Sequence, residues 1–176
     1  MALFPPAPGG GEQVDYGYKG KGVVMHLLAD ANGRPVLIRN TGAKGNEREQ
    51  AMVLLNNIST YEPPTGRIVE ADKGYDAYWL RREVLQMGAL PLIPYRSNAK
   101  NAPSMKEVCE AFNCLRVRWK VERAIAWLKR KYRRLLMRWE RLAIMWKAFT
   151  MPFIDTLLAN YFSGIGSYQN KIEQTY

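Results

Sequence analysis

The chain has few of the residues that build disulfide and metal–thiolate sites. Its 176 residues include two cysteines, Cys109 and Cys114, and a single histidine. The spacing of the two cysteines fits neither a zinc-binding pair nor a redox pair, and one histidine cannot complete a zinc site. We therefore expect reduced cysteines, as in a cytoplasmic protein, and no zinc centre.

Long hydrophobic runs are missing too. No apolar stretch approaches the roughly 18 residues that a membrane-spanning helix needs. The first residues, Met-Ala-Leu-Phe-Pro-Pro-Ala-Pro, carry no basic segment and no extended apolar segment, so they do not form a signal peptide. The sequence predicts a protein with no membrane partner.

Acidic residues are scarce relative to basic ones. The chain has 26 Lys and Arg against 16 Asp and Glu, which gives a net charge of +10 and a pI of about 9.7. The excess is concentrated between Arg116 and Lys147, where twelve Lys or Arg accompany two acids, Glu122 and Glu140. A concentrated positive charge favours a polyanionic partner, most simply nucleic acid, over charge that only aids solubility.

Local patterns predict one mixed α/β domain, since 47% of the residues are hydrophobic and the length suffices for a core. Residues 1–20 are rich in Pro and Gly and are expected to be irregular. We expect a hairpin of strands 22–29 and 35–39 around an Asn32-Gly33 turn, and a helix that Asn46 caps. A strand at 67–71, a helix that Asp76 caps and Gly88 ends, and an edge strand at 90–95 follow. Residues 105–162 are expected to be helical. This order favours a mixed sheet with helices on both faces.

Two carboxylates stand out chemically. Glu122 lies on one stripe of the expected helix with Arg118 and Lys129, offset by about 40° and about 20° at 100° per residue. An acid in so basic a helix suits a divalent cation whose neighbours hold phosphates, although it also suits a helix-stabilising partner of Arg118. Asp72 ends the expected strand at 67–71, where functional groups gather in α/β sheets, although an Asp before Lys-Gly can simply form a turn.

Three segments carry a family resemblance. They are Arg118-x3-Glu122-x6-Lys129, Glu70-Ala-Asp-Lys-Gly-Tyr-Asp76, and Tyr16-Gly-Tyr-Lys-Gly-Lys-Gly-Val-Val-Met-His26. In this order they resemble the DDE-class transposases of bacterial insertion sequences, over nearly the whole chain. The resemblance implies a ribonuclease-H-like fold and metal-dependent phosphodiester cleavage and strand transfer at element ends. It also implies a two-ion Mg²⁺ or Mn²⁺ site, double-stranded DNA as partner, a homodimer in the DNA complex, and a bacterial, nucleoid-associated location.

Carried over residue by residue, the resemblance makes Asp72 and Glu122 the second and third metal-binding acids. The family's first acid falls on position 1, which is Met1 here if Phe4 matches the family's phenylalanine. The chain then corresponds to the C-terminal portion of such a protein, with a shortened first strand. Asp30, in the hairpin turn, is the alternative first acid, although a turn role is favoured for it. The cations expected to bind DNA are Arg118, Lys129, Arg130, Lys131, Arg133 and Arg134.

The implied organisation is an irregular remnant of the first-strand region at 1–20, a catalytic domain at 21–162 and a flexible tail at 163–176. A DNA-binding remnant without catalytic activity is the alternative function, and a nuclease unrelated to transposition is a third. For His26 a packed position in the core is favoured over a catalytic role. For Trp119, Trp127, Trp139 and Trp146, packing is favoured over base stacking.

Overall fold

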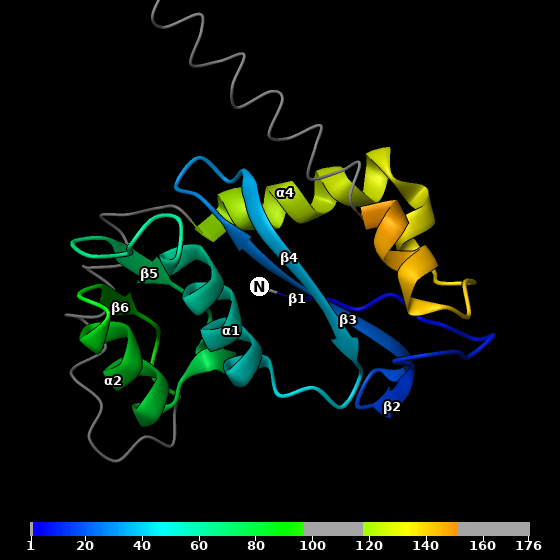
Figure 1. Ribbon diagram of the computed structural model, residues 1–176, viewed down its shortest axis with the longest axis horizontal. Helices are drawn as coiled ribbons and strands as arrows, with labels where there is room; N and C mark the ends of the chain where they lie inside the picture. The colour runs from blue at the N-terminus through cyan, green and yellow to red at the C-terminus, as the bar shows by residue number, and fades with distance from the viewer. Residues whose placement is uncertain (1, 97–117, 151–176) are drawn as a thin grey trace, which may run out of the picture.

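A long antiparallel hairpin forms the centre of the structure. The computed structural model describes residues 2–96 and 118–150. Strand β3 (Gly20–Ala29) pairs with β4 (Pro35–Gly42) from Val23↔Gly42 to Ala29↔Pro35, with a bulge between Leu28 and Ala29. The predicted hairpin is confirmed, and both strands extend beyond the predicted limits (Figure 1).

The other edge of β3 carries two short strands, β1 (Ala2–Leu3) and β2 (Asp15–Gly17). Both run antiparallel to β3, and the result is a four-stranded sheet. The expectation of irregular structure throughout residues 1–20 is therefore wrong for these two segments. The chain between them also bonds to β3, since Ala7 N donates to Lys21 O at 3.1 Å and Val23 N donates to Pro5 O at 3.1 Å. Main-chain pairing of this kind needs no distinctive side chains, which is why composition did not indicate it.

A second, two-stranded sheet lies apart from the first. Its strands β5 (Ile68–Glu70) and β6 (Leu90–Leu92) are parallel, and the chain passes from one to the other through the 3₁₀ turn η1 (Lys73–Tyr75) and helix α2 (Tyr78–Gln86). After α2 the chain turns at Gly88, whose φ is +75°. Among the described strands β6 pairs only with β5, as its Pro91 predicted.

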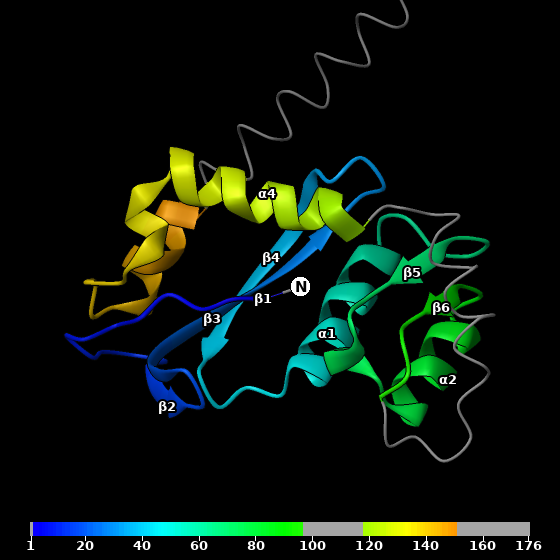
Figure 2. The same cartoon turned by 180° about the vertical axis from the view of Figure 1, so that it is seen from behind.

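Helices cover both faces of the four-stranded sheet. Helix α1 (Glu47–Ser59) contacts β3 and β4, and its N-cap is Asn46, whose side chain accepts from Arg48 N at 3.1 Å. Helix α4 (Arg118–Lys131) packs on the opposite face. Alternate residues of β3 point to opposite faces of the sheet. Met25 belongs to the hydrophobic cluster that includes Ile125 of α4, whereas Leu28 packs against the cluster around α1 and α2. The mixed α/β class with helices on both faces is confirmed (Figure 2).

The C-terminal region, expected to be helical over residues 105–162, is helical in its described part only with an interruption. Helix α4 ends at Lys131, and Tyr132, at φ −117° and ψ 69°, leaves the helical conformation. A 3₁₀ turn η2 (Arg133–Leu136) follows, and residues 143–150 are helical again. This reversal buries Leu135 and Trp146 against β3, which a straight helix could not do. Residues 105–117, 151–162 and the expected tail at 163–176 lie outside the described residues.

The helix that Asp76 was expected to cap begins one residue later, at Tyr78, and its N-cap is Ala77, which makes no capping hydrogen bond. Asp76 instead binds the Arg81 side chain and the Arg96 main chain. Within residues 2–96 and 118–150, no helix has the length and hydropathy needed to cross a bilayer.

Candidate metal and DNA site

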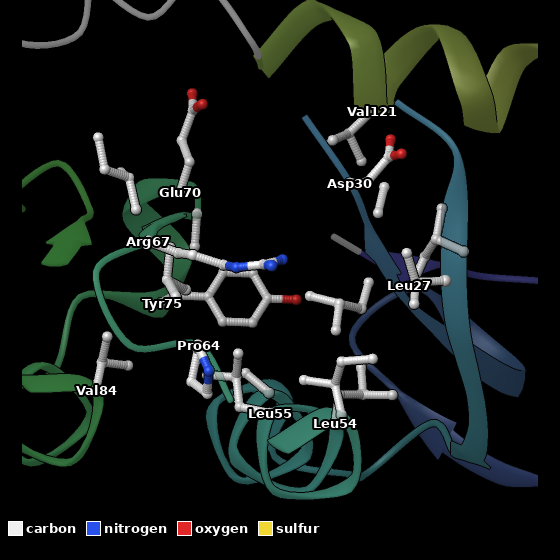
Figure 3. A pocket seen from close by; sticks show the side chains of 18 of the residues that line it. Leu27, Asp30, Leu54, Leu55, Pro64, Arg67, Glu70, Tyr75, Val84 and Val121 are labelled. Atoms are coloured by element: carbon white, nitrogen blue, oxygen red, sulfur yellow. The ribbon is translucent and has the colours of Figure 1, made fainter. Parts of the chain in front are cut away.

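A cavity of about 700 Å³ separates the two sheets. Its walls come from β3, from α1, from β5 and η1, and from the start of α4 (Figure 3). Most of the lining is apolar and includes Leu27, Leu54, Leu55, Tyr75 and Val121. The carboxylates among the lining residues are Asp30, Glu62, Glu70, Asp72 and Glu122.

Asp72 lies just beyond the end of β5, with one residue, Ala71, between them, close to the strand end that the sequence predicted. Its Oδ1 accepts a hydrogen bond from Gly74 N at 2.6 Å, which makes Asp72 the N-cap of η1. The carboxylate therefore has a turn-forming role, and one of its two oxygens is engaged in it. Among the described residues, nothing donates to Oδ2, so this oxygen can serve a cation at the cavity.

Two arginines from distant segments fix the loop that carries Asp72. Arg48 Nε on α1 donates to Gly74 O at 3.1 Å, and Arg96 Nη2, beyond β6, donates to the same carbonyl at 3.2 Å. Arg96 Nε also reaches Lys73 O at 3.4 Å. These donors restrain the backbone on the C-terminal side of Asp72 and place positive charge beside it. Sequence reasoning missed both arginines, because neither belongs to a motif.

Tyr75 forms part of the cavity wall. Its ring is buried against Leu55, Leu80 and Val84. Burial, with the negative charges of Glu47 and Asp72 nearby, raises the pKa of the Tyr75 phenol above its ordinary value. The phenol is therefore neutral at physiological pH and can donate a proton in a hydrogen bond. The Asp-Lys-Gly-Tyr segment contains this residue, but nothing in the sequence indicated its burial.

Glu122 lies near the start of α4 and is exposed. It lines the same cavity as Asp72, although 50 positions separate the two acids in the sequence. Val121 beside it packs against the core cluster of β3, which orients this part of α4 toward the cavity. The side chain of Arg118, the predicted partner of Glu122, lies outside the described residues.

The carboxylate set is incomplete as a metal centre. Among the described residues, no three His, Cys, Asp or Glu side chains gather closely enough to hold an ion. Asp30 Oδ1 accepts from Asn32 N at 2.9 Å and from Arg34 N at 2.8 Å. These bonds confirm the turn role that was favoured for Asp30.

His26 is a core residue, as favoured from the sequence. It is 2% exposed, and its Nε2 lies 2.8 Å from Thr41 Oγ1. Burial, helped by the charges of the N-terminus and Arg39, lowers its pKa to about 4. The imidazole is therefore neutral at physiological pH.

The basic residues after Glu122 differ in their exposure to solvent and in their hydrogen-bond partners. Lys129, Arg130, Lys131 and Arg133 are exposed. Arg134 is exposed as well, but its Nη2 lies 2.6 Å from Glu140 Oε1. Arg138, one of the twelve cations of this region, is 1% exposed and donates to the carbonyls of Glu140 and Arg141. The charge available to an external polyanion is thus concentrated at the end of α4 and the start of η2.

The chain belongs to the DDE transposase family. The family described as "Transposase DDE domain" matches residues 5–154, which includes Asp72, Glu122 and the basic segment. The chain is also 35% identical over 130 residues to a Burkholderia cepacia protein named "Putative transposase for insertion sequence element IS402". That alignment covers 70% of this chain and 56% of the relative, so the chain spans about half the length of this relative. No solved structure matches the chain.

Proposed function

We propose that this chain is the catalytic portion of an insertion-sequence transposase that cuts and rejoins phosphodiester bonds of double-stranded DNA in the bacterial cytoplasm, at the nucleoid. The observation that supports the proposal is that Asp72 and Glu122 both line one cavity. The two acids come from a strand end and from a helix 50 positions later, and both lie within the family match.

The finer assignment of the fold is ribonuclease-H-like. Its support is the hairpin of β3 and β4 followed by α1, and then the parallel pair β5 and β6 with a helical crossover. In this arrangement Asp72 lies at the carboxyl end of β5, the edge at which open α/β sheets place functional groups.

The donor chemistry of the two acids fits a hard divalent cation. Mg²⁺ and Mn²⁺ prefer carboxylate oxygens, which Asp72 and Glu122 offer, and the described residues bring no thiolate to the cavity. A bound pair of such ions would activate the attacking water or 3′-hydroxyl and stabilise the leaving oxygen. The protein's own part is to hold Asp72 through its bond to Gly74 N, and to fix that loop through Arg48 and Arg96.

Two carboxylates are fewer than the family uses. We therefore expect the 176-residue chain to bind Mg²⁺ or Mn²⁺ weakly and to show little strand transfer by itself. The match to the transposase family favours the catalytic function over the alternative, a DNA-binding remnant without catalysis. Metal binding distinguishes these two functions. A catalytic chain should bind metal through Asp72 and Glu122, whereas a remnant that only binds DNA should not depend on these acids for metal binding.

The metal test uses Mn²⁺ as the probe, followed by electron paramagnetic resonance in titrations of the whole chain. We expect Asp72→Asn and Glu122→Gln each to weaken Mn²⁺ binding by about tenfold or more. Glu49→Gln is the matched control, because Glu49 is exposed on α1 and lies outside the cavity lining. Equal Mn²⁺ affinity in all four proteins would overturn the catalytic assignment.

The DNA test uses a duplex of random sequence in a filter-binding series at increasing salt. Replacing Lys129, Arg130, Lys131, Arg133 and Arg134 by Gln should weaken binding and flatten the dependence of log K on log salt. Arg118 belongs to the same proposed surface. We propose that a homodimer engages the DNA, so sedimentation of the chain with and without duplex forms part of this experiment.

A further inference from the structure

The connection between β2 and β3 is a short turn with aromatic and basic side chains. Strand pairing ends at Gly17↔Gly20, so Tyr18 and Lys19 alone form the loop. Residues 16–22 read Tyr-Gly-Tyr-Lys-Gly-Lys-Gly and contain no acid. They belong to one of the three segments that carry the family resemblance, yet they do not line the cavity of the candidate metal site. A part in that site therefore does not account for them.

The backbone of this turn is packed against two other segments. A Cβ on Gly17 would lie 2.5 Å from Ala43 O, so residue 43 covers the side of the hairpin to which residue 17 points. On the β3 strand, Lys21 Nζ donates to Pro8 O at 3.4 Å, and Ala7 N donates to Lys21 O at 3.1 Å. Two-residue hairpin loops also adopt only a small set of turn types. The turn therefore presents its side chains from a well-supported backbone.

Two tyrosines and two lysines project from this backbone. Alternate strand residues point to opposite sides, so Tyr16 points away from residue 43 and to the same side as Lys21, which lies directly opposite it. Lys21 Nζ is 6.0 Å from the centre of the Tyr16 ring, and Tyr16 is 69% exposed. Tyr18 is fully exposed at the tip, and Lys19 beside it is exposed as well.

The acids that precede the turn in the sequence are engaged elsewhere. Glu12 Oε2 accepts from Ala143 N at 2.8 Å, and the Asp15 carboxylate lies against Gly42, where a Cβ would collide with it. The charge at the tip is thus set by its two lysines. Figures 1 and 2 both show β2 at the end of the molecule where α4 ends, away from α2. The tip therefore adds positive charge at the same end of the molecule as the exposed cations that follow Glu122.

We propose that residues 16–21, called here the tyrosine turn, bind unpaired nucleotides of DNA. Tyr16 and Tyr18 stack on bases, and Lys19 and Lys21 contact the neighbouring phosphates. Stacking on a side chain needs a base with a free face, which an unpaired nucleotide offers and an intact duplex does not. The inference rests on the proposed function, because the cutting and rejoining of strands exposes unpaired nucleotides at the cut ends.

The test measures binding of an oligothymidylate to the whole chain in the presence of EDTA, so that metal plays no part. We expect Tyr16→Ala and Tyr18→Ala each to weaken binding by about tenfold, the size of one lost base stack. Tyr16→Phe and Tyr18→Phe should bind normally, because they keep the ring. Tyr61→Ala is the matched control, since Tyr61 is 85% exposed but lies beside Glu62 and outside the tyrosine turn. Equal affinity in both alanine variants and this control would overturn the proposal.

An abasic oligonucleotide of the same length separates stacking from charge. It keeps the phosphates and lacks the bases, so Tyr18→Ala should leave its affinity unchanged. Lys19→Gln should reduce the slope of log K against log salt by about 0.7 for both oligonucleotides, the value for one phosphate contact on a single strand. If Tyr18→Ala weakened binding of the abasic strand, or of a random duplex, as much as that of the oligothymidylate, the stacking role would be overturned.

The result can be told apart from that of the metal test. If the unmodified chain did not bind the oligothymidylate, the tyrosine turn proposal would fail even where Asp72→Asn and Glu122→Gln weaken Mn²⁺ binding as expected. If those two variants kept their Mn²⁺ affinity while Tyr18→Ala lost the oligothymidylate, the catalytic assignment would fail and the single-strand contact would remain.

Discussion

Asp76 and Arg81 form an ion pair with little solvent exposure, with Arg81 Nη2 2.9 Å from Asp76 Oδ1. The second oxygen of Asp76 accepts from Arg96 N at 2.7 Å, and Arg81 Nη2 also donates to Ile93 O at 2.7 Å. The Arg81 guanidinium lies 3.9 Å from the centre of the Tyr95 ring. The pair thus connects the start of α2 to the chain beyond β6, and so stabilises the unit that presents Asp72.

Replacing Asp76 by Asn should destabilise the protein by about 2 kcal/mol, because a charged hydrogen-bond acceptor is lost beside a buried cation. Burial opposes ionisation of Asp76, but the hydrogen bonds from Arg96 and Arg81 outweigh it and hold its pKa below 3.8. Since the folded state depresses this pKa, the stabilisation is complete above about pH 4 and is lost as the pH falls through the lowered value. Urea unfolding at pH 7 and pH 3 measures both effects. Arg82→Gln is the control, since Arg82 is exposed and its contact with Glu83 is 3.7 Å long. If Arg82→Gln lowered the free energy of unfolding as much as Asp76→Asn, the stabilising role of the Asp76–Arg81 pair would be contradicted.

His26 should make the free energy of unfolding depend on pH in a range above that of Asp76. Its pKa is about 4 in the folded protein and 6.5 as the ordinary value, so the unfolded chain binds the proton more readily. Stability therefore falls as the pH drops from about 6.5 toward 4, by a total of about 3 kcal/mol from this group. His26 is the one histidine of the chain, which makes the slope attributable. Urea unfolding at pH 7.5, 6 and 5 should show a slope that His26→Gln reduces, and an unchanged slope would show that His26 is not buried as described.

Trp146 and Trp139 offer a matched comparison of packing. Trp146 is 1% exposed in the cluster with Met25 and Leu135, whereas Trp139 is 59% exposed. Trp146→Ala should cost about 3–5 kcal/mol of unfolding free energy, because a large cavity replaces the indole. Trp139→Ala should cost less than about 1 kcal/mol. Chemical denaturation of both variants measures the difference, and similar losses would place Trp139 in a core as well.

Local chemistry was enough to predict several boundaries from the sequence. Asn46 caps α1, and Gly88 follows the end of α2. Pro91 lies in β6, which pairs on one side only among the described strands. Each of these signals acts within a few residues, through a side-chain cap, a left-handed backbone conformation or a missing N–H. Their meaning therefore depends little on the rest of the fold.

Features that depend on distant segments could not be predicted in this way. The chain leaves the helical path at Tyr132 without a glycine or proline, because burial of Leu135 and Trp146 against β3 outweighs helix propensity. Asp76 looked like a helix cap, yet a main-chain N–H from 20 positions away competes for its carboxylate. For the site, the resemblance indicated Asp72 and Glu122, while Arg48 and Arg96 emerge only from the packing around Gly74.

The neighbours Arg133 and Arg134 should differ in their contribution to DNA binding. Both are exposed, and either could contact phosphate by position alone. Arg134, however, donates to Glu140 Oε1 through Nη2 at 2.6 Å and through Nε at 3.0 Å. Burial opposes ionisation of Glu140, but the bonds from Arg134 and from the main chain keep its pKa below the ordinary value. Arg134 must give up this partner before it can bind DNA, whereas no acid among the described residues pairs with Arg133.

We therefore expect Arg133→Gln to reduce the slope of log K against log salt by about 0.9, the value for one lost phosphate contact on duplex DNA. Arg134→Gln should change that slope less and should lower the unfolding midpoint instead, because Glu140 then loses its charged donor. Filter binding of a random duplex between 50 and 200 mM salt, about the range in which phosphate contacts are resolved, measures the slopes, and thermal unfolding measures stability. Lys44→Gln is the control for loss of one exposed charge outside the basic segment. If Arg134→Gln flattened the slope as much as Arg133→Gln and left stability unchanged, the ion pair with Glu140 would not persist in solution, and Arg134 would belong to the DNA-binding surface on equal terms.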